Sequence, residues 1–559
     1  MNMRHHMESS VVIVGAGPVG LGMAIELSQR GIDCTVIDEG DGHVDHPRTG
    51  LVAVRTMELF RRWGLASAVR QCGFPEDYTL SMVFCTSLNG WLLGREDYPS
   101  MRNAPTPDST PEKKQRCPQM WLQPILADAA RSSANIQLLY QHRCTGMERA
   151  TDGVCIQVTS LKDGNTLKVE GRYLLACDGA ASSIRQQMGI EMEGRLLSHS
   201  VNILFRAPDL TKHHPMGQAE RYMFVGPDGM WGNLTVVDGR DIWRLTVLGS
   251  GEKMNLESFN AREWVLRALG TEQDPGRIPF DVMSVIPWRR AEMLAKHYVK
   301  GRVLLVGDSA HSMSPTGGMG MNTGMQEVLD LGWKLQGMFE GWGGNGLLDS
   351  YDSERRPIAA RNISFSTQNF RSWQDTPNPQ KVCDNSPQGS RLRNELGTRL
   401  RDLTRVEWES MGLQIGHRYV NSPICVADGT LQPPDDFREY VPSTWPGARA
   451  PHAWLADGRS TLDLFGHGFV LVQFDDCRPG VAAALESAFA QRKVPFQTVS
   501  LTNAAIRQLY ERPLVLVRPD GHVAWRGENV QDAFALVDTV RGARGNTPGV
   551  AEAGSKSSA

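Results

Sequence analysis

The sequence predicts an α/β protein built from a nucleotide-binding unit, an inserted sheet and a separate C-terminal module. Three observations carry this prediction. A glycine-rich turn joins a short apolar strand to a helix near the start of the chain. Short, aromatic-rich strands with alternating polarity follow between about Leu196 and Leu248. A proline-rich stretch, Ser422 to Pro451, then precedes a last run of strands and helices. With 559 residues the chain is long enough for about three domains.

The first unit begins with an apolar strand, Val11 to Val14, followed at once by the turn Gly15-Ala16-Gly17-Pro18-Val19-Gly20. A helical stretch, Leu21 to Arg30, leads to a second strand, Cys34 to Ile37, and then to Asp38. This order is typical of a Rossmann-type domain, whose glycines let a pyrophosphate approach the helix N-terminus and whose acid accepts hydrogen bonds from a ribose. The unit therefore predicts a nucleotide site, with a plain glycine turn as the alternative.

Two later clusters repeat the pattern of an apolar strand that ends in a glycine and an acid. Leu174 to Arg185 contains Asp178-Gly179, and Arg302 to His311 contains Gly307-Asp308 before the glycine-rich run Pro315 to Gly324. Strand ends of one doubly wound sheet meet at its carboxyl edge. We therefore expect all three clusters to contact one ligand that is larger than a mononucleotide.

The expected domains are discontinuous. Residues 1–195 and 280–372 form the nucleotide-binding domain, 196–279 the mostly antiparallel sheet, 373–447 a helical segment and a linker across the surface, 448–544 the C-terminal α/β module, and 545–559 a disordered tail. Sheet strands are expected at Val201–Phe205, Arg221–Val225, Met230–Val237 and Ile242–Leu248, and helices at Met325–Phe339 and Arg391–Gly412. C-terminal elements are expected at Gly468–Phe474, Val481–Arg492, Phe496–Ser500, Leu514–Arg518 and Val523–Trp525.

Composition excludes several classes of function. Lys and Arg total 59 and Asp and Glu total 62, for a net charge of −3, which disfavours nucleic acid as a partner. We see neither a signal peptide nor a membrane span and expect a cytoplasmic protein with no membrane partner. The ten cysteines include no C-x-x-C pair, which argues against a disulfide framework or a zinc ribbon. His5-His6 and His213-His214 lack metal-ligand spacing, so we expect no metal and place them in surface loops.

The motifs GxGxxG, DGxxSxxR and GDxAHxxxPxxGxGxN occur in this order, and together they resemble those of the class A flavoprotein monooxygenases, which are FAD-dependent aromatic hydroxylases. The run Pro446 to His452 and the α/β tail are similar to the branch of phenol hydroxylase, 2,4-dichlorophenol hydroxylase and 3-(3-hydroxyphenyl)propionate hydroxylase. That branch has a thioredoxin-like C-terminal domain without a working dithiol. The resemblance implies a Rossmann-type FAD-binding domain, an inserted substrate sheet and such a third domain.

The resemblance also implies a cofactor and a reaction. FAD would be held tightly but not covalently, NAD(P)H would bind transiently, and O2 would form a flavin C4a-hydroperoxide that hydroxylates a phenolic ring. A non-hydroxylating flavoprotein of the same fold, either a regulator or an oxidase, is the alternative. Neither a halogenase Trp-x-Trp-x-Ile-Pro motif nor a reductase cysteine pair occurs. The choice among simple phenols, phenolic acids, substituted phenols and polyketide aromatics stays open, as do the proton-transfer residues. We expect a homodimer.

Carried over by position, the cofactor-binding candidates are Gly15, Gly17, Gly20, Asp38, Glu39, Arg48, Arg55, Gln123, Asp178, Asp308, Pro315, Gly320, Met321 and Asn322. Asp38 stands where the family usually has Glu, so Glu39 is the alternative ribose contact. The helix that begins near Met321 would favour flavin reduction, because its N–H groups stabilise negative charge. Surface roles are the alternatives for Arg48, Arg55 and Gln123. His311 is expected to be structural and bonded to backbone.

The substrate pocket is expected between the flavin and the inserted sheet. Its candidate lining residues are Asn202, Leu204, Tyr222, Phe224, Trp231, Trp243, Arg244 and Trp288. Each of them has a core role as its alternative, because large side chains in strands are more often packed in a core than exposed to a pocket.

Overall fold

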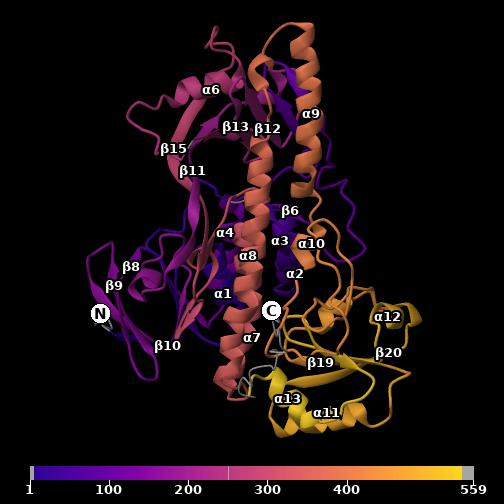
Figure 1. The fold of residues 1–559 in the computed structure, drawn as a ribbon. Coiled ribbons are helices and arrows are strands. Elements are labelled where there is room, and N and C mark those ends of the chain that lie inside the picture. Colours follow the sequence, from indigo (N-terminus) through magenta and orange to yellow (C-terminus); the bar gives the residue numbers. More distant parts are fainter. Residues whose placement is uncertain (1–5, 49, 250, 544–559) are drawn as a thin grey trace, which may run out of the picture.

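The computed structural model describes residues 6–48, 50–249 and 251–543. The predictions for His5 and for the tail 545–559 lie outside these residues. The molecule is elongated (Figure 1), with one sheet and its helix α6 (Ala261–Leu269) at one end and the C-terminal elements at the other. Helix α8 (Gly346–Gln374) runs through most of this length. In the described residues no helix is long and apolar enough to span a membrane.

The first sheet has the parallel core expected of a Rossmann-type unit. Its order is β16-β17-β10-β1-β2-β7, and the β8–β9 hairpin is added to β10. β1 pairs in parallel with β2 and β10, and α1 packs against α4 and α7. The bounds are β1 His6–Val14, α1 Pro18–Gln29, β2 Cys34–Ile37, α4 Gln119–Arg131, β7 Ile136–Leu139, β8 His142–Arg149, β9 Val154–Ser160, β10 Thr166–Ala176, α5 Ser183–Gln187, β16 Val299–Lys300, β17 Val303–Leu305 and α7 Met319–Glu340.

The second sheet, here called the substrate sheet, is antiparallel except at one pair. Its order is β18-β15-β11-β14-β13-β12-β4-β5, and only β12–β4 is parallel among the named strands. The bounds are β4 Met82–Cys85, β5 Leu92–Glu96, β11 Met192–Arg206, β12 Arg221–Gly226, β13 Gly229–Val236, β14 Ile242–Leu248, β15 Asp281–Ala295 and β18 His311–Ser312. β4 and β5 lie in the 1–195 range that we expected in the nucleotide-binding domain. β4 pairs with β12, which lies far along the chain, and β5 pairs with β4, so no local pattern predicts their place in this sheet.

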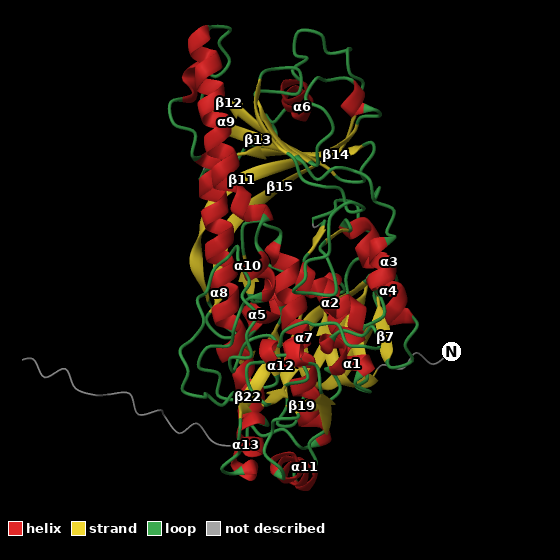
Figure 2. Cartoon of the chain, turned by 90° about the vertical axis from the view of Figure 1, so that its right-hand side faces the viewer, coloured by secondary structure: helices red, strands yellow, loops and turns green. Residues whose placement is uncertain are grey.

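Long helices tie the two sheets together. α8 was not predicted, because its sequence is polar and contains Pro357. α9 (Pro387–Trp408) lies beside α8 near the substrate sheet (Figure 2), and α10 (Met411–Ile415) follows it. The remaining elements before the C-terminal domain are β3 Leu51–Val52, α2 Val54–Arg62, α3 Ala66–Arg70, β6 Gln115–Arg116 and the short 3-10 turns Leu210–Lys212, Gly307–Ser309 and Pro379–Lys381.

The C-terminal domain has its own four-stranded sheet, ordered β20-β19-β21-β22. β19 and β20 are parallel, whereas β21 and β22 are antiparallel to their neighbours, which is the thioredoxin-like arrangement that the sequence predicted. The bounds are β19 Phe469–Phe474, α11 Val481–Gln491, β20 Phe496–Leu501, α12 Ala504–Leu509, β21 Leu514–Val517, β22 Val523–Gly527 and α13 Ala533–Val540, after a 3-10 turn at Thr461–Leu464. The prediction of a linker across the surface was wrong for its C-terminal end. Residues 443–450 are mostly buried.

Candidate functional site

The three glycines of the first turn differ in what surrounds them. Gly15 has φ +107°, and a Cβ there would lie 2.2 Å from the carbonyl oxygen of Cys177. A Cβ on Gly20 would lie 1.9 Å from the carbonyl oxygen of Gly15. A Cβ on Gly17 would meet nothing within 4 Å. Gly15 and Gly20 therefore make the tight turn possible, and Gly17 leaves open space at the N-terminus of α1, where a pyrophosphate can accept backbone N–H bonds.

Asp38 lies at the end of β2, directly beside this turn. Its carboxylate accepts the Ala16 N–H at 2.6 Å and the Gly40 N–H at 2.7 Å. A carboxylate has further lone pairs for ribose hydroxyls, so Asp38 suits the ribose role. Glu39 instead forms an exposed ion pair with Arg143 at 2.9 Å. The geometry thus favours Asp38 over Glu39.

The second and third motifs bring Asp178 and Asp308 to the same sheet edge, next to the ends of β10 and β17. Asp178 accepts the Ile184 N–H at 3.2 Å through Oδ2, while its buried Oδ1 has no partner among the described residues. Asp308 is open to solvent, and its Oδ1 would lie 3.8 Å from a Cβ on Gly320. An unpaired carboxylate oxygen and an open one at the start of α7 are suited to a ligand that donates hydrogen bonds.

The first turn of α7 is held in place by side-chain hydrogen bonds. Pro315 is exposed, and Met321 is half-buried. The buried Asn322 side chain accepts the Ala53 N–H at 2.9 Å and donates to the carbonyls of Leu51 at 3.0 Å and Gly318 at 2.7 Å. With its hydrogen bonds used in this way, its side chain fastens α7 to α2. Only the backbone at this helix start is free to face a cofactor.

The three candidates with surface alternatives have different surroundings. Gln123 is buried, with its amide nitrogen 3.5 Å from the Gly42 carbonyl oxygen. Arg48 is exposed, and its backbone N–H donates to Gln119 Oε1 at 3.0 Å. Arg55 does not have the surface role that was its alternative. It is buried against the C-terminal domain, where it bonds the Asp520 carbonyl at 2.7 Å. Residues far apart in the chain make this contact, so no local motif indicates it.

The substrate sheet has two faces, and the eight candidates divide between them. Tyr222, Phe224, Trp231 and Trp243 belong to the hydrophobic core on the α6 side, so they do not line the site. The other four, Asn202, Leu204, Arg244 and Trp288, lie on the opposite face, which looks toward the first sheet. The pocket prediction was wrong for the four residues on the α6 side because it selected aromatic side chains. The alternation of residues along each strand is the better guide to which face a side chain occupies, because cross-strand partners share a face.

The same pairing finds residues that the sequence reasoning missed. Leu204 pairs with Arg244, Arg244 with Thr235, and Thr235 with Arg221, so these four side chains form one row on the site face. Arg244 is partly buried and donates to the Pro47 carbonyl at 2.9 Å. Burial and the nearby charges of Arg116 and Arg221 lower the pKa of Arg244 to about 10.

Two of these arginines have acidic partners. Arg116 pairs with Glu220 at 3.1 Å and Arg221 with Glu407 at 2.8 Å, but Arg244 has no ion pair among the described residues. Nearby, His46 Nδ1 lies 3.0 Å from Ser284 Oγ of β15. Burial, Arg244 and Arg48 lower the pKa of His46 to about 4, so this imidazole is neutral. Of Arg116, Arg221 and Arg244, Arg244 is therefore the one without an acidic partner among the described residues.

Two of the histidine predictions need correction, those for His311 and His214, whereas His213 is exposed as predicted. His311 is fully buried, but it pairs with Glu327 at 3.3 Å rather than with backbone. Burial opposes its charged form, yet Glu327 raises the His311 pKa overall. His214 is buried and packs against Tyr222 instead of lying on the surface. Within the part of the chain that the structure describes, no group of three metal-ligating side chains occurs.

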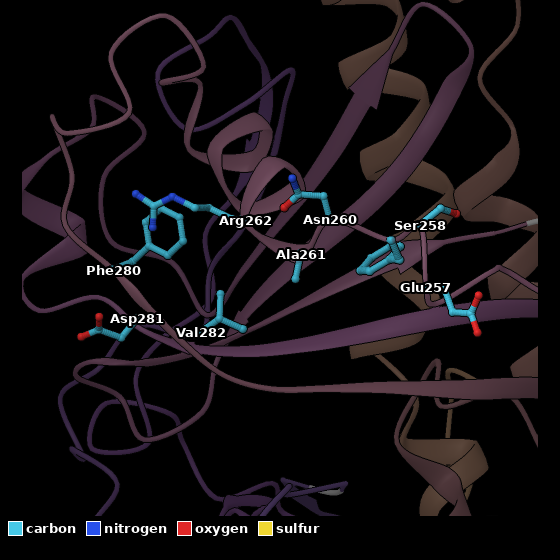
Figure 3. A pocket seen from close by; sticks show the side chains of 9 residues that line it. Glu257, Ser258, Asn260, Ala261, Arg262, Phe280, Asp281 and Val282 are labelled. Carbon is cyan, nitrogen blue, oxygen red and sulfur yellow. The ribbon is translucent and has the colours of Figure 1, made fainter.

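A hollow beside α6 lies apart from these residues (Figure 3). It is lined by residues 257–262 and 280–282, and Arg262 lies over the ring of Phe280 there. None of the cofactor or site-face residues lines it, so it is not part of the candidate site.

Comparisons with known proteins agree with this geometry. A model described as "FAD binding domain" matches residues 8–366, and one described as "Aromatic-ring hydroxylase, C-terminal" matches residues 443–546. The chain belongs to the FAD-dependent aromatic-ring hydroxylases. This confirms the resemblance that the three motifs indicated, and it makes the protein an FAD-dependent monooxygenase of that family.

Several named proteins are similar to this chain over most of their length. "FAD-dependent monooxygenase apdD" of Emericella nidulans is 30% identical, covering 93% of this chain and 88% of the relative. "2,4-dichlorophenol 6-monooxygenase" of Delftia acidovorans is 29% identical, covering 94% and 96%. Among solved structures, "the rebeccamycin biosynthetic enzyme RebC with reduced flavin" is 38% identical with a TM-score of 0.89, covering 96% of this chain and all of that one. The "flavin-dependent monooxygenase PieE in complex with FAD and substrate" is 28% identical with a TM-score of 0.83, covering 96% and 98%.

Proposed function

We propose that the protein hydroxylates an electron-rich aromatic ring, such as a phenol, that carries a carboxylate, using O2 and NAD(P)H. Arg244 is the observation that carries the choice of an acidic substrate. A buried cation without a counter-ion is costly, and a ligand carboxylate that pairs with it recovers that cost. Arg116 and Arg221 beside it are already paired with Glu220 and Glu407, so Arg244 is the member of this group that is left for a ligand.

The residues at the sheet edge fit tightly but non-covalently bound FAD. Gly15, Gly17 and Gly20 would hold its pyrophosphate and Asp38 its ribose, while Asp178 and Asp308 would contact the parts nearer the ring. Bound FAD supplies the electron transfer and the oxygen activation that protein side chains lack. The N–H groups at the start of α7 would stabilise negative charge on a nearby reduced ring.

NAD(P)H would bind transiently, because no second strand, glycine turn and ribose acid is present in the sequence. A homodimer remains our proposal for the assembly. RebC has been solved "with bound 7-carboxy-K252c", and aklavinone-11 hydroxylase with FAD and aklavinone. These complexes support large aromatic acids and polyketide aromatics as compounds to test beside simple phenolic acids.

The test pairs each aromatic acid with its uncharged amide and measures substrate-stimulated NAD(P)H oxidation. We expect the acids to be preferred. Arg244→Gln should raise KM for an acid about tenfold or more, because it removes a charge-assisted hydrogen bond to the carboxylate. It should change KM for the amide little. The control is Arg240→Gln, an exposed arginine before β14. Equal preference for acid and amide, unchanged by Arg244→Gln, would refute an acidic substrate. NAD(P)H oxidation that yields only peroxide with every compound would favour an oxidase.

A further inference from the structure

We propose that Glu407 is a positioning residue for the cofactor: it holds the loop Ser314–Gly317, here called the flavin loop, against the flavin and joins it to the substrate sheet. Glu407 lies near the end of α9, in the segment 367–442 that neither matching family model covers. The inference rests on the FAD site proposed above, because that proposal sets the flavin loop beside the ring.

The Glu407 carboxylate is buried and fully engaged. Oε1 accepts the Gly317 N–H at 3.1 Å and the Arg221 Nη1–H at 2.8 Å. Oε2 accepts the indole N–H of Trp373, at the end of α8, at 3.0 Å. One side chain therefore connects the flavin loop with β12 and α8. Because the acceptor is ionised, its hydrogen bonds are about twice as strong as those to a neutral group.

The other end of the flavin loop is held by the same charged cluster. Arg290 of β15 is buried and donates to Ser314 Oγ at 2.5 Å. Ser314 Oγ lies 2.7 Å from the Thr316 hydroxyl, which donates to the Ser366 carbonyl of α8 at 2.6 Å. Burial lowers the pKa of Arg290 to about 9, and Glu407 is the carboxylate that opposes this shift. The cations of the cluster come from the substrate sheet, and its anion comes from α9.

The shape of the flavin loop needs such a support. Gly317 has φ +85°, and a Cβ there would lie 2.7 Å from the ring of Phe365, so the loop passes very close to α8 in a left-handed conformation. A loop in this state keeps its geometry only while its polar groups are held. Losing the Glu407 charge would weaken the hydrogen bond from the Gly317 N–H and leave Arg221 without its counter-ion. Flavin contacts would change even though Glu407 need not touch the flavin.

The test measures FAD rather than turnover. Apoprotein of the wild type and of Glu407→Gln is titrated with FAD by flavin fluorescence, and the midpoint potential and visible spectrum of the bound flavin are recorded. The matched control is Glu112→Gln, which removes another buried carboxylate paired with Arg61 and Arg70. Both variants should lower the apoprotein melting temperature. Only Glu407→Gln should bind FAD about tenfold or more weakly and shift the potential and the spectrum.

Two outcomes overturn the proposal. In the first, Glu407→Gln has the FAD affinity, potential and spectrum of Glu112→Gln. The second outcome applies if Glu407→Gln does not fold. The variant Trp373→Phe then removes the donor to Oε2, and a flavin potential and spectrum at wild-type values would overturn the proposal. A smaller shift in Trp373→Phe supports the proposal. Failure of wild-type apoprotein to bind FAD refutes the proposed function instead.

Discussion

Arg518 Nη1 of the C-terminal domain lies 2.5 Å from Glu354 Oε1 of α8, across 164 residues of sequence. Both side chains are fully buried. Arg518 also reaches Asp330 of α7 at 2.9 Å, and Lys334 lies between Asp330 and Glu354 at 2.8 and 2.6 Å. The C-terminal domain thus supplies a cation that the acids of the FAD-binding domain need.

The first prediction is that Arg518→Met destabilises the whole protein. The variant leaves Asp330 and Glu354 buried with Lys334 as their main counter-ion, and breaking a buried pair in this way costs about 3–5 kcal/mol. Denaturant unfolding measures the loss. Arg507→Met, which breaks a more exposed pair with Asp476, should cost about 1 kcal/mol or less. Equal costs for the two variants would refute a special role for Arg518.

The second prediction concerns acid stability and Glu58. Burial alone would raise the Glu58 pKa, but Arg449 and Arg55 lower it to about 2 from its ordinary 4.5. Because the folded pKa is depressed, Glu58 contributes stability above about pH 5 that is lost as pH falls toward 2. The shift corresponds to about 3 kcal/mol.

Unfolding free energies measured from pH 7 to pH 3 check this dependence. Glu58→Gln should be less stable at pH 7 and lose less stability on acidification than the wild type. If the unfolding free energy of Glu58→Gln falls with pH as steeply as that of the wild type, other carboxylates control the acid sensitivity and the prediction is wrong.

The third prediction separates cofactor binding from folding. Gly17→Ala fits the structure, because a Cβ there meets nothing within 4 Å and its φ of −68° suits alanine. The methyl group would occupy the space that we assign to the pyrophosphate. FAD affinity should fall about tenfold or more, with no loss of apoprotein stability. Gly276→Ala, also in open space, should change neither quantity. Wild-type FAD affinity in Gly17→Ala would contradict the assignment.

The fourth prediction is that Asp308→Ala loses FAD affinity and keeps its fold. Asp308 is exposed at the turn after β17. A charge-assisted hydrogen bond to the cofactor is worth about 1.5–3 kcal/mol. Isothermal titration with FAD, beside apoprotein melting, measures the two effects. A variant with wild-type affinity would show that Asp308 does not face the cofactor.

The first sheet and its cofactor edge could be predicted because their signals are local. Gly15, Gly20 and Asp38 lie within one strand, turn, helix, strand unit, and each position has one physical reason. Strand patterns likewise indicated the α/β elements of the C-terminal domain, whose thioredoxin-like arrangement was implied by the family resemblance. Family resemblance then extended the assignment to Asp178 and Asp308.

The parts that failed depend on contacts between distant segments. The contacts of Arg55 with Glu58 and with Asp520 of the C-terminal domain were not predicted, because Asp520 is far from it in the chain. Trp243 and Tyr222 are large side chains whose face is decided by strand register, and register is not visible in a single strand. Glu407 acts through Gly317 and Arg221, and no motif marks a residue that is defined by its partners.

The most direct test of the central claim is the mass of the product formed under ¹⁸O₂ with the preferred aromatic acid and NAD(P)H. A monooxygenase acting as proposed puts one labelled oxygen atom on the ring, in step with NAD(P)H consumed. Labelled product is therefore the expected result. Product whose new oxygen comes from water, or NAD(P)H oxidation that yields peroxide and no hydroxylated ring for every acid tested, would contradict the account.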